Sequence, residues 1–135
     1  MTNIAPWAKK YVGIPFASGG RSRSGLDCYG LVRMVRVEQF DDDLPLFSDD
    51  YTDADNFTET EKLMREQRPL LAGRQVREPA PGDVCVIRFH GLPTHLGIYA
   101  GGGWLLHTLR GFDSVLQRIS DPILAGRIEG WYRVN

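Results

Sequence analysis

The sequence of 135 residues has few cysteines, no long apolar run and no surplus of charge of one sign. Its two cysteines, Cys28 and Cys85, are too few for the disulfide framework that stabilises many small secreted domains. No apolar stretch approaches the roughly 20 residues of a membrane-spanning helix, and the N-terminal segment MTNIAPWAKKYVG lacks the apolar core of a signal peptide. We therefore expect synthesis in the cytoplasm without an export signal, and no insertion into a membrane.

The balance of charge limits the partners of the chain. The 16 basic and 17 acidic residues leave a net charge of −1, which is not typical of a protein that binds nucleic acid. The length and the 42% share of hydrophobic residues suit one globular domain over residues 1–135. We find no internal repeat or low-complexity segment that would divide it.

Helix-like patterns occupy the first half of the chain and strand-like patterns the second half. The patterns predict a short helix over 4–13, a glycine-rich loop over 14–25, a helix over 28–40 in spite of Gly30, and a polar helix over 56–70. Short runs typical of strands follow at 83–89, 94–100, 103–109, 114–120 and 126–134. Helices followed by strands predict an α+β fold in which N-terminal helices pack on a C-terminal antiparallel sheet.

The two cysteines occupy different kinds of position. Cys85 shares one face of its predicted strand with Ile87, which is typical of a buried core thiol. Cys28 begins the predicted helix over 28–40, where the partial positive charge of the helix N-terminus lowers the pKa of a thiol. Backbone N–H groups at the same end can stabilise an oxyanion. A cysteine at a helix start serves packing more often than chemistry, so this position alone is a weak signal.

Two of the three histidines, His95 and His107, lie on consecutive predicted strands on either side of Gly101. In a hairpin centred on Gly101 the two positions are directly opposed on one face, with Cβ atoms roughly 4.5–5.5 Å apart. A loop of three or five residues gives this pairing, whereas a loop of two or four sends the rings to opposite faces. Paired imidazoles in a chain with an activated cysteine predict a nucleophile, a base and a group that orients the base.

Three sequence blocks, in order, resemble the NlpC family of cell-wall cysteine peptidases. They read VGIPFASGGRSRSGLDCYGLV, then PGDVCVIRF with THLGIYAGG, and then WLLHT. The resemblance implies a papain-like fold in which Cys28 is the nucleophile, His95 the general base and acid, and His107 the residue that orients His95. It also implies hydrolysis of amide bonds in peptidoglycan stem peptides, typically between D-glutamate and the following diamino acid, with no metal or organic cofactor.

The resemblance also indicates residues that would contact the substrate. Asp27 matches the family's aspartate before the cysteine and would help to bind the free amine of the stem peptide. The sequence departs from the family pattern at Phe16, where the family has tyrosine, and at Tyr29, where it has serine. Both positions border the subsite that reads the N-terminal end of the stem peptide, so the substrate preference is open.

One branch of the family is more similar to this chain than the rest. A compact form without a leader, with an aromatic residue after the cysteine and the stretches LVRMVRVEQF and LPLFSDDY behind it, resembles the tail-associated peptidases of tailed phages and gene transfer agents. That resemblance implies incorporation into the tail of a phage-like particle, with other tail or baseplate proteins as partners.

Two alternatives use the same residues differently. The changes at Phe16 and Tyr29 are compatible with a structural tail or hub subunit whose peptidase site has decayed, although Cys28, His95 and His107 are all present. The same cysteine and histidines could instead bind zinc, with water as the fourth ligand. No closely spaced pair of metal ligands, such as C-x-x-C or H-E-x-x-H, supports the zinc alternative.

Overall fold

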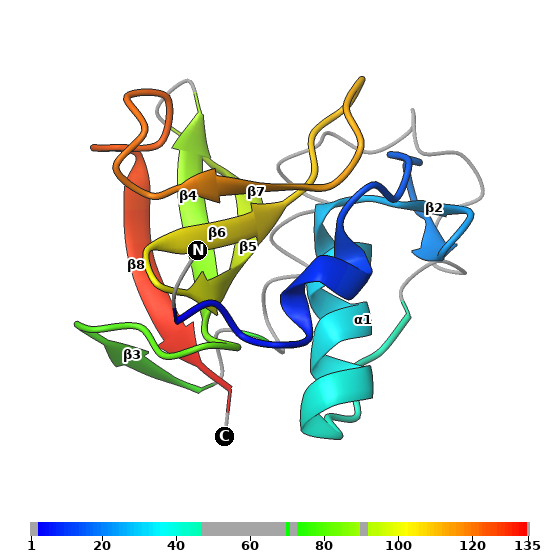
Figure 1. Cartoon of the computed structure of the whole chain (residues 1–135), viewed down its shortest axis with the longest axis horizontal. Helices are drawn as coiled ribbons and strands as arrows, with labels where there is room; N and C mark the ends of the chain where they lie inside the picture. The colour runs from blue at the N-terminus through cyan, green and yellow to red at the C-terminus, as the bar shows by residue number, and fades with distance from the viewer. Residues whose placement is uncertain (1–2, 47–69, 71–72, 90–91, 135) are drawn as a thin grey trace.

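The computed structural model describes residues 3–46, 70, 73–89 and 92–134. In this part of the chain one α-helix packs beside a six-stranded antiparallel sheet, as Figure 1 shows. The helix comes from the first half of the sequence and the sheet from the second half, which confirms the predicted α+β class. The polar helix predicted over 56–70 falls almost wholly outside the described residues.

The helix α1 spans Cys28–Phe40, the stretch that the apolar spacing predicts. Asp27 is its N-cap, because the Asp27 side chain accepts a hydrogen bond from the backbone N–H of Gly30 at 2.8 Å. The helix ends at Asp41, which adopts the left-handed conformation with φ of 59°. Leu31, Val32 and Val35 are fully buried on the face toward the sheet, and each such side chain contributes about 1.5–3 kcal/mol relative to an exposed one.

Gly30 lies in the first turn of α1, where glycine is a poor helix former. A Cβ atom at this position would overlap the carbonyl oxygen of Gly20. The glycine therefore lets the loop before the helix pass directly over its first turn. Close packing of this loop, and not helix propensity, explains the residue.

The sheet has the strand order β3-β8-β4-β5-β6-β7, and every neighbouring pair is antiparallel. The strands are β3 (Arg74–Val76), β4 (Val84–Phe89), β5 (Leu92–Gly101), β6 (Trp104–His107), β7 (Val115–Arg118) and β8 (Ile128–Arg133). Five of them lie within, or overlap, the predicted runs; β3 was not predicted. Because β3 is short and mostly exposed, its sequence has no apolar alternation that would indicate a strand.

Two clusters of buried side chains lie on the two faces of β4. Val84 and Val86 belong to the larger cluster, which also contains the buried residues of α1. Cys85 and Ile87 belong to the smaller cluster, together with Trp131 of β8. Cys85 is therefore a buried core thiol, as predicted, and burial raises its pKa.

The segment before α1 is more structured than the sequence predicts. The short helix near the N-terminus is one turn of 3-10 helix, η1 (Ala8–Tyr11). The predicted loop over 14–25 contains the strand β1 (Arg21–Ser22), which pairs with β2 (Gly25–Leu26). Two-residue strands carry too few side chains to show a periodic pattern. None of the described helices is long and apolar enough to cross a membrane.

Candidate active site

Cys28 is the first residue of α1, and its side chain is half-buried against the larger core cluster. The helix packs against β5, the strand that carries His95, and also contacts β6, the strand that carries His107. Figure 1 shows the C-terminal end of β6 directed toward the N-terminal end of α1. The fold thus places the predicted nucleophile at the helix end toward which β6, the strand of His107, is directed.

The carboxylate of Asp27 has several partners at the start of α1. Besides the Gly30 N–H, it accepts hydrogen bonds from the backbone N–H of Gly19 at 2.9 Å and from the guanidinium of Arg21 at 2.7 Å. Both side chains of the Arg21–Asp27 ion pair are nearly inaccessible to solvent. Asp27 therefore joins the preceding loop to the helix start. Arg21 was not predicted as a site residue, because only the pairing of β1 with β2 brings it to this position.

His95 and His107 are buried and bonded to each other. Nε2 of His95 lies 2.9 Å from Nδ1 of His107, and the two rings meet edge to face with centroids 5.1 Å apart. Both residues are at most 3% exposed. The predicted juxtaposition of the two imidazoles is therefore confirmed.

The predicted direct opposition of the two histidines in the hairpin is wrong. Ile98 pairs with Leu106, which sets His107 two residues away from a position opposite His95. The loop between Gly101 and Trp104 has two residues, and that length alone would separate the rings. A register shift between Tyr99 and Gly101 moves the pairing by one residue and returns both side chains to the same face of the sheet. The two histidines are therefore diagonal neighbours on that face.

A third polar side chain extends the histidine pair. Oε1 of Gln117, on β7, lies 2.7 Å from Nε2 of His107. Leu105 pairs with Gln117 and His107 pairs with Val115, so Gln117 is again a diagonal neighbour on the same face. The three side chains cross β5, β6 and β7 in sequence. Gln117 was not predicted as a site residue; its one signal in the sequence is a polar side chain between Leu116 and Arg118 on a predicted strand.

Burial controls the charge of both imidazoles. Loss of solvent, and secondarily the proximity of His107, lowers the pKa of His95 to about 3. Loss of solvent also lowers the pKa of His107, while its hydrogen bond to Gln117 acts in the opposite direction. Both rings are therefore neutral at neutral pH, and His95 is in the state required of a general base.

Phe16 and Tyr29, the two predicted substrate contacts that depart from the family pattern, lie in different surroundings. Phe16 is half-buried, and the guanidinium of Arg110 lies 5.4 Å from the centre of its ring. Tyr29 is fully buried, and its hydroxyl donates to the carbonyl of Pro45 at 2.6 Å. Tyr29 thus anchors the chain after α1. Contact of Asp27, Phe16 and Tyr29 with a substrate stays a prediction.

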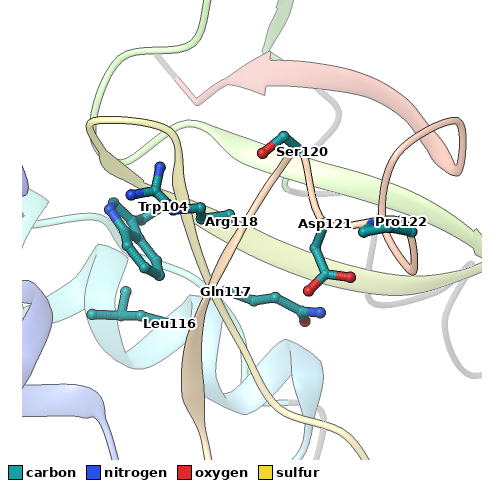
Figure 2. A pocket seen from close by; sticks show the side chains of 7 residues that line it. All are labelled: Trp104, Leu116, Gln117, Arg118, Ser120, Asp121 and Pro122. Atoms are coloured by element: carbon teal, nitrogen blue, oxygen red, sulfur yellow. The ribbon is translucent and has the colours of Figure 1, made fainter.

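A pocket of about 460 Å³ lies beside β7, and Gln117 is one of the residues that line it. Its lining residues, drawn in Figure 2, are Trp104, Leu116, Gln117, Arg118, Ser120, Asp121 and Pro122. Figure 2 shows the amide of Gln117 and the carboxylate of Asp121 turned toward each other. The guanidinium of Arg118 lies 4.7 Å from the centre of the Trp104 ring.

The histidine nitrogens are arranged for hydrogen bonding rather than for a shared metal. Nε2 of His95 and Nδ1 of His107 point at each other, so they cannot both direct lone pairs to one ion between them. Within the residues that the structure describes, no group of three histidine, cysteine or acidic side chains has a metal-binding arrangement. The geometry favours the base-and-orienting-residue interpretation over the zinc alternative.

One helix beside an antiparallel sheet, with a cysteine at the helix start and paired histidines on the sheet, defines the papain-like class of α+β domains. The sequence matches the NlpC/P60 family over residues 13–125, and the chain belongs to this family. The chain is 23% identical over 122 residues to the Escherichia coli K12 protein named murein DD-endopeptidase MepS/murein LD-carboxypeptidase. That alignment covers 90% of this chain and 54% of the relative, so the chain spans about half the length of the curated relatives it matches.

Solved structures share the fold. The NlpC/p60 domain of the peptidoglycan hydrolase SagA aligns with 93% of this chain and 92% of its own, with a TM-score of 0.62 and 22% identity. An NlpC/P60 family protein of Bacillus cereus aligns with 94% of this chain and 37% of its own, with a TM-score of 0.69 and 19% identity. The papain-like fold predicted from the three sequence blocks is confirmed.

Proposed function

We propose that this chain is a cysteine peptidase that hydrolyses amide bonds in the stem peptides of bacterial peptidoglycan. The observation that carries the proposal is the buried His95–His107 pair, on strands that contact the helix begun by Cys28. Membership of a family of peptidoglycan hydrolases supports the same chemistry. In this function Cys28 is the nucleophile, His95 the general base and acid, and His107 the orienting residue.

The reaction uses Nδ1 of His95, because Nε2 is bonded to His107. Sγ of Cys28 attacks the carbonyl carbon while the thiol proton passes to Nδ1 of His95. Backbone N–H groups at the start of α1 stabilise the oxyanion. The C–N bond then breaks as His95 returns the proton to the leaving amine, which leaves a thioester on Cys28. Water attacks the thioester and His95 accepts one proton from it. The C–S bond then breaks as His95 returns this proton to Cys28, and the product carboxylic acid loses its remaining proton to solvent.

The lowered pKa of His95, caused by burial, favours a neutral imidazole at rest. A neutral His95 beside Cys28 favours a thiol–imidazole pair, in which the proton moves as the sulfur attacks. This differs from a preformed thiolate–imidazolium pair, which requires an imidazole that is charged at rest. The buried environment of His95 supports the general-base form of the mechanism.

Two bonds are candidates for cleavage. The resemblance of the three sequence blocks favours the amide between D-glutamate and the diamino acid. The name of the Escherichia coli relative favours a DD-endopeptidase activity as the second candidate. If the first of these bonds is cleaved, Asp27 would bind the free amine of the substrate. The carboxylate of Asp27 is already paired with Arg21, so the amine would compete with Arg21 for it.

The biological setting that we propose is the tail of a phage-like particle, where the chain would act on the cell wall next to other tail or baseplate proteins. The aromatic residue Tyr29 after the cysteine and the stretches that follow it support this setting by resemblance. Detection of the chain by mass spectrometry in purified particles tests the setting. Its absence from the particles, at a detection limit below one copy per particle, would refute it.

Digestion of defined muropeptides tests the activity. Wild-type protein should release products whose masses identify the bond that is cut, and Cys28→Ala should release none while keeping its fold by circular dichroism. Cys85→Ala is the matched control, because Cys85 is the other cysteine of the chain and is buried in the core. This control should lose stability, by about 1 kcal/mol or more, and keep its activity.

The alternative functions predict other results. A structural subunit with a decayed site predicts no product from the wild-type protein on any muropeptide. Activity that persists in Cys28→Ala would remove Cys28 from the mechanism. A zinc enzyme predicts stoichiometric zinc in the purified protein and loss of activity with a chelator.

A further inference from the structure

The contact between His107 and Gln117 determines which nitrogen of each imidazole carries hydrogen. An amide oxygen can only accept a hydrogen bond, so Nε2 of His107 must donate to Oε1 of Gln117 across their 2.7 Å separation. A neutral imidazole has a single N–H group, so Nδ1 of His107 is then an acceptor. Nε2 of His95, 2.9 Å away, must donate to it. Nδ1 of His95 is left without a hydrogen, which is the form of the ring that can accept the thiol proton.

We propose that Gln117 is a positioning residue that selects the reactive tautomer of His95 through His107. This inference rests on the proposed peptidase function and adds a fourth member to the Cys28, His95 and His107 set. Gln117 contacts no reacting atom; it acts through two hydrogen bonds, across three neighbouring strands.

The orientation of the Gln117 amide decides which nitrogen of His95 carries the hydrogen. With the amide reversed, its NH2 group would donate to Nε2 of His107, and both imidazoles would switch tautomer. His95 would then carry its hydrogen on Nδ1 and could not accept the proton of Cys28. Gln117 therefore has one productive orientation and one that blocks the reaction.

We infer that Asp121, which lines the same pocket as Gln117, favours the productive orientation. Asp121 and Gln117 line the same pocket, and Figure 2 shows their polar ends turned toward each other. Carboxylate oxygens accept hydrogen bonds, so a carboxylate at this place favours the NH2 end of the amide on its side and leaves the amide oxygen for His107. Asp121 is itself held in place, because its Oδ1 accepts a hydrogen bond from the backbone N–H of Ile123 at 2.9 Å.

Neutral rings are a condition of this arrangement, since a charged imidazole has two N–H groups and no tautomer to select. The burial that lowers the pKa of both histidines satisfies this condition at neutral pH. An amide suits the position better than a carboxylate would. A carboxylate at residue 117 would accept the same hydrogen bond and would also raise the pKa of His107.

Three variants test the role of Gln117. Gln117→Met keeps the length of the side chain and removes the acceptor. Gln117→Glu keeps an acceptor and adds a charge, and Gln117→Lys replaces the acceptor with a donor. Leu116→Met is the matched control, because Leu116 lines the same pocket from the same strand without contacting the histidines through a polar atom.

The first measurement is the 15N NMR spectrum of histidine-labelled protein at neutral pH, which reports the tautomer of each ring without any reaction. Wild type, Gln117→Glu and Leu116→Met should show hydrogen on Nε2 of both His95 and His107. Gln117→Met should show mixed tautomers, and Gln117→Lys should show hydrogen on Nδ1. Wild-type tautomers in both Met and Lys variants would overturn the proposal.

The second measurement is the pH profile of kcat on the muropeptide that the wild type cleaves. Gln117→Met should lose roughly tenfold or more in kcat, the order of magnitude typical for removal of a partner that orients a functional histidine. Gln117→Glu should restore most of this loss and move the acidic limb of the profile to higher pH. Equal losses in the Met and Glu variants, or a loss with unchanged tautomers, would show a merely structural role and overturn the proposal. An inactive wild type would refute the peptidase function, while the NMR measurement would still decide the role of Gln117.

Discussion

Burial of His95 should make the folded chain less stable at acidic pH. The pKa of His95 is lowered from its ordinary value of 6.5 to about 3, because the folded chain removes the ring from solvent. Between these values the unfolded chain binds a proton that the folded chain does not. The free energy of unfolding is therefore not reduced by His95 above about pH 6.5. It falls as the pH decreases from about 6.5 toward about 3, because the unfolded chain gains the proton first.

The magnitude follows from the width of the window. Each pH unit within it costs about 1.4 kcal/mol of unfolding free energy for one proton. Acidification from about pH 6.5 to about pH 4.5 should therefore remove roughly 3 kcal/mol through His95. Since a small domain has about 5–15 kcal/mol in total, this loss is a large share of its stability.

Urea unfolding of wild type and His95→Gln, followed by tryptophan fluorescence, measures this effect. His95→Gln cannot titrate at position 95, so its stability should fall less steeply with acid. The difference between wild type and variant should shrink by roughly 3 kcal/mol between about pH 7 and about pH 4.5. His107 and the carboxylates remain in both proteins, so most of their own contribution cancels in the comparison.

Ile98→Val is the matched control, because it changes a buried residue of the same strand that does not titrate. Its unfolding free energy should be lower than that of the wild type by a constant amount at every pH. If His95→Gln also paralleled the wild type, burial of a neutral His95 would not be a source of acid sensitivity. His95 would then not be held neutral by burial, and the general-base form of the mechanism would lose its support.

The remaining predictions concern the nucleophile, the orienting histidine and the helix start. A thiol-directed reagent should modify Cys28 well before Cys85, as mass spectrometry of alkylated peptides can show, because Cys85 is buried and its pKa is raised; faster labelling of Cys85 would contradict its place in the core. His107→Asn or His107→Gln should keep measurable muropeptide hydrolysis, whereas His107→Ala should lose more, and wild-type activity in His107→Ala would make the residue a bystander. Gly30→Ala should lower the midpoint of thermal unfolding although alanine is the better helix former by about 1 kcal/mol, because its Cβ atom overlaps the Gly20 carbonyl; a raised midpoint would refute that packing. Asp27→Ala should cost about 1–3 kcal/mol in urea unfolding, because it removes the helix cap and leaves Arg21 buried without this partner, and an unchanged midpoint would refute both roles.

Local patterns in the sequence determined most of the secondary structure. The apolar spacing predicts α1 with both of its ends, because the helix buries one continuous face, whereas its capping residue Asp27 was not predicted. The β-like runs predict five of the six strands of the main sheet, because each carries apolar residues between turn-forming ones. The position of Cys28 at a helix start and the burial of Cys85 within a strand follow from the same local patterns.

The geometry of the site was decided by the tertiary structure. The sequence predicts that His95 and His107 meet, but the register that brings them together depends on an irregularity between Tyr99 and Gly101 that no local pattern indicates. Gln117 joins them only because β7 pairs with β6 in one particular register. Pairing between strands is set by packing over the whole sheet, and a shift of one residue would turn these side chains to the other face. The sequence by itself therefore predicted Cys28, His95 and His107 as the site residues, and the assembled sheet decided which nitrogens of the two histidines face each other and Gln117.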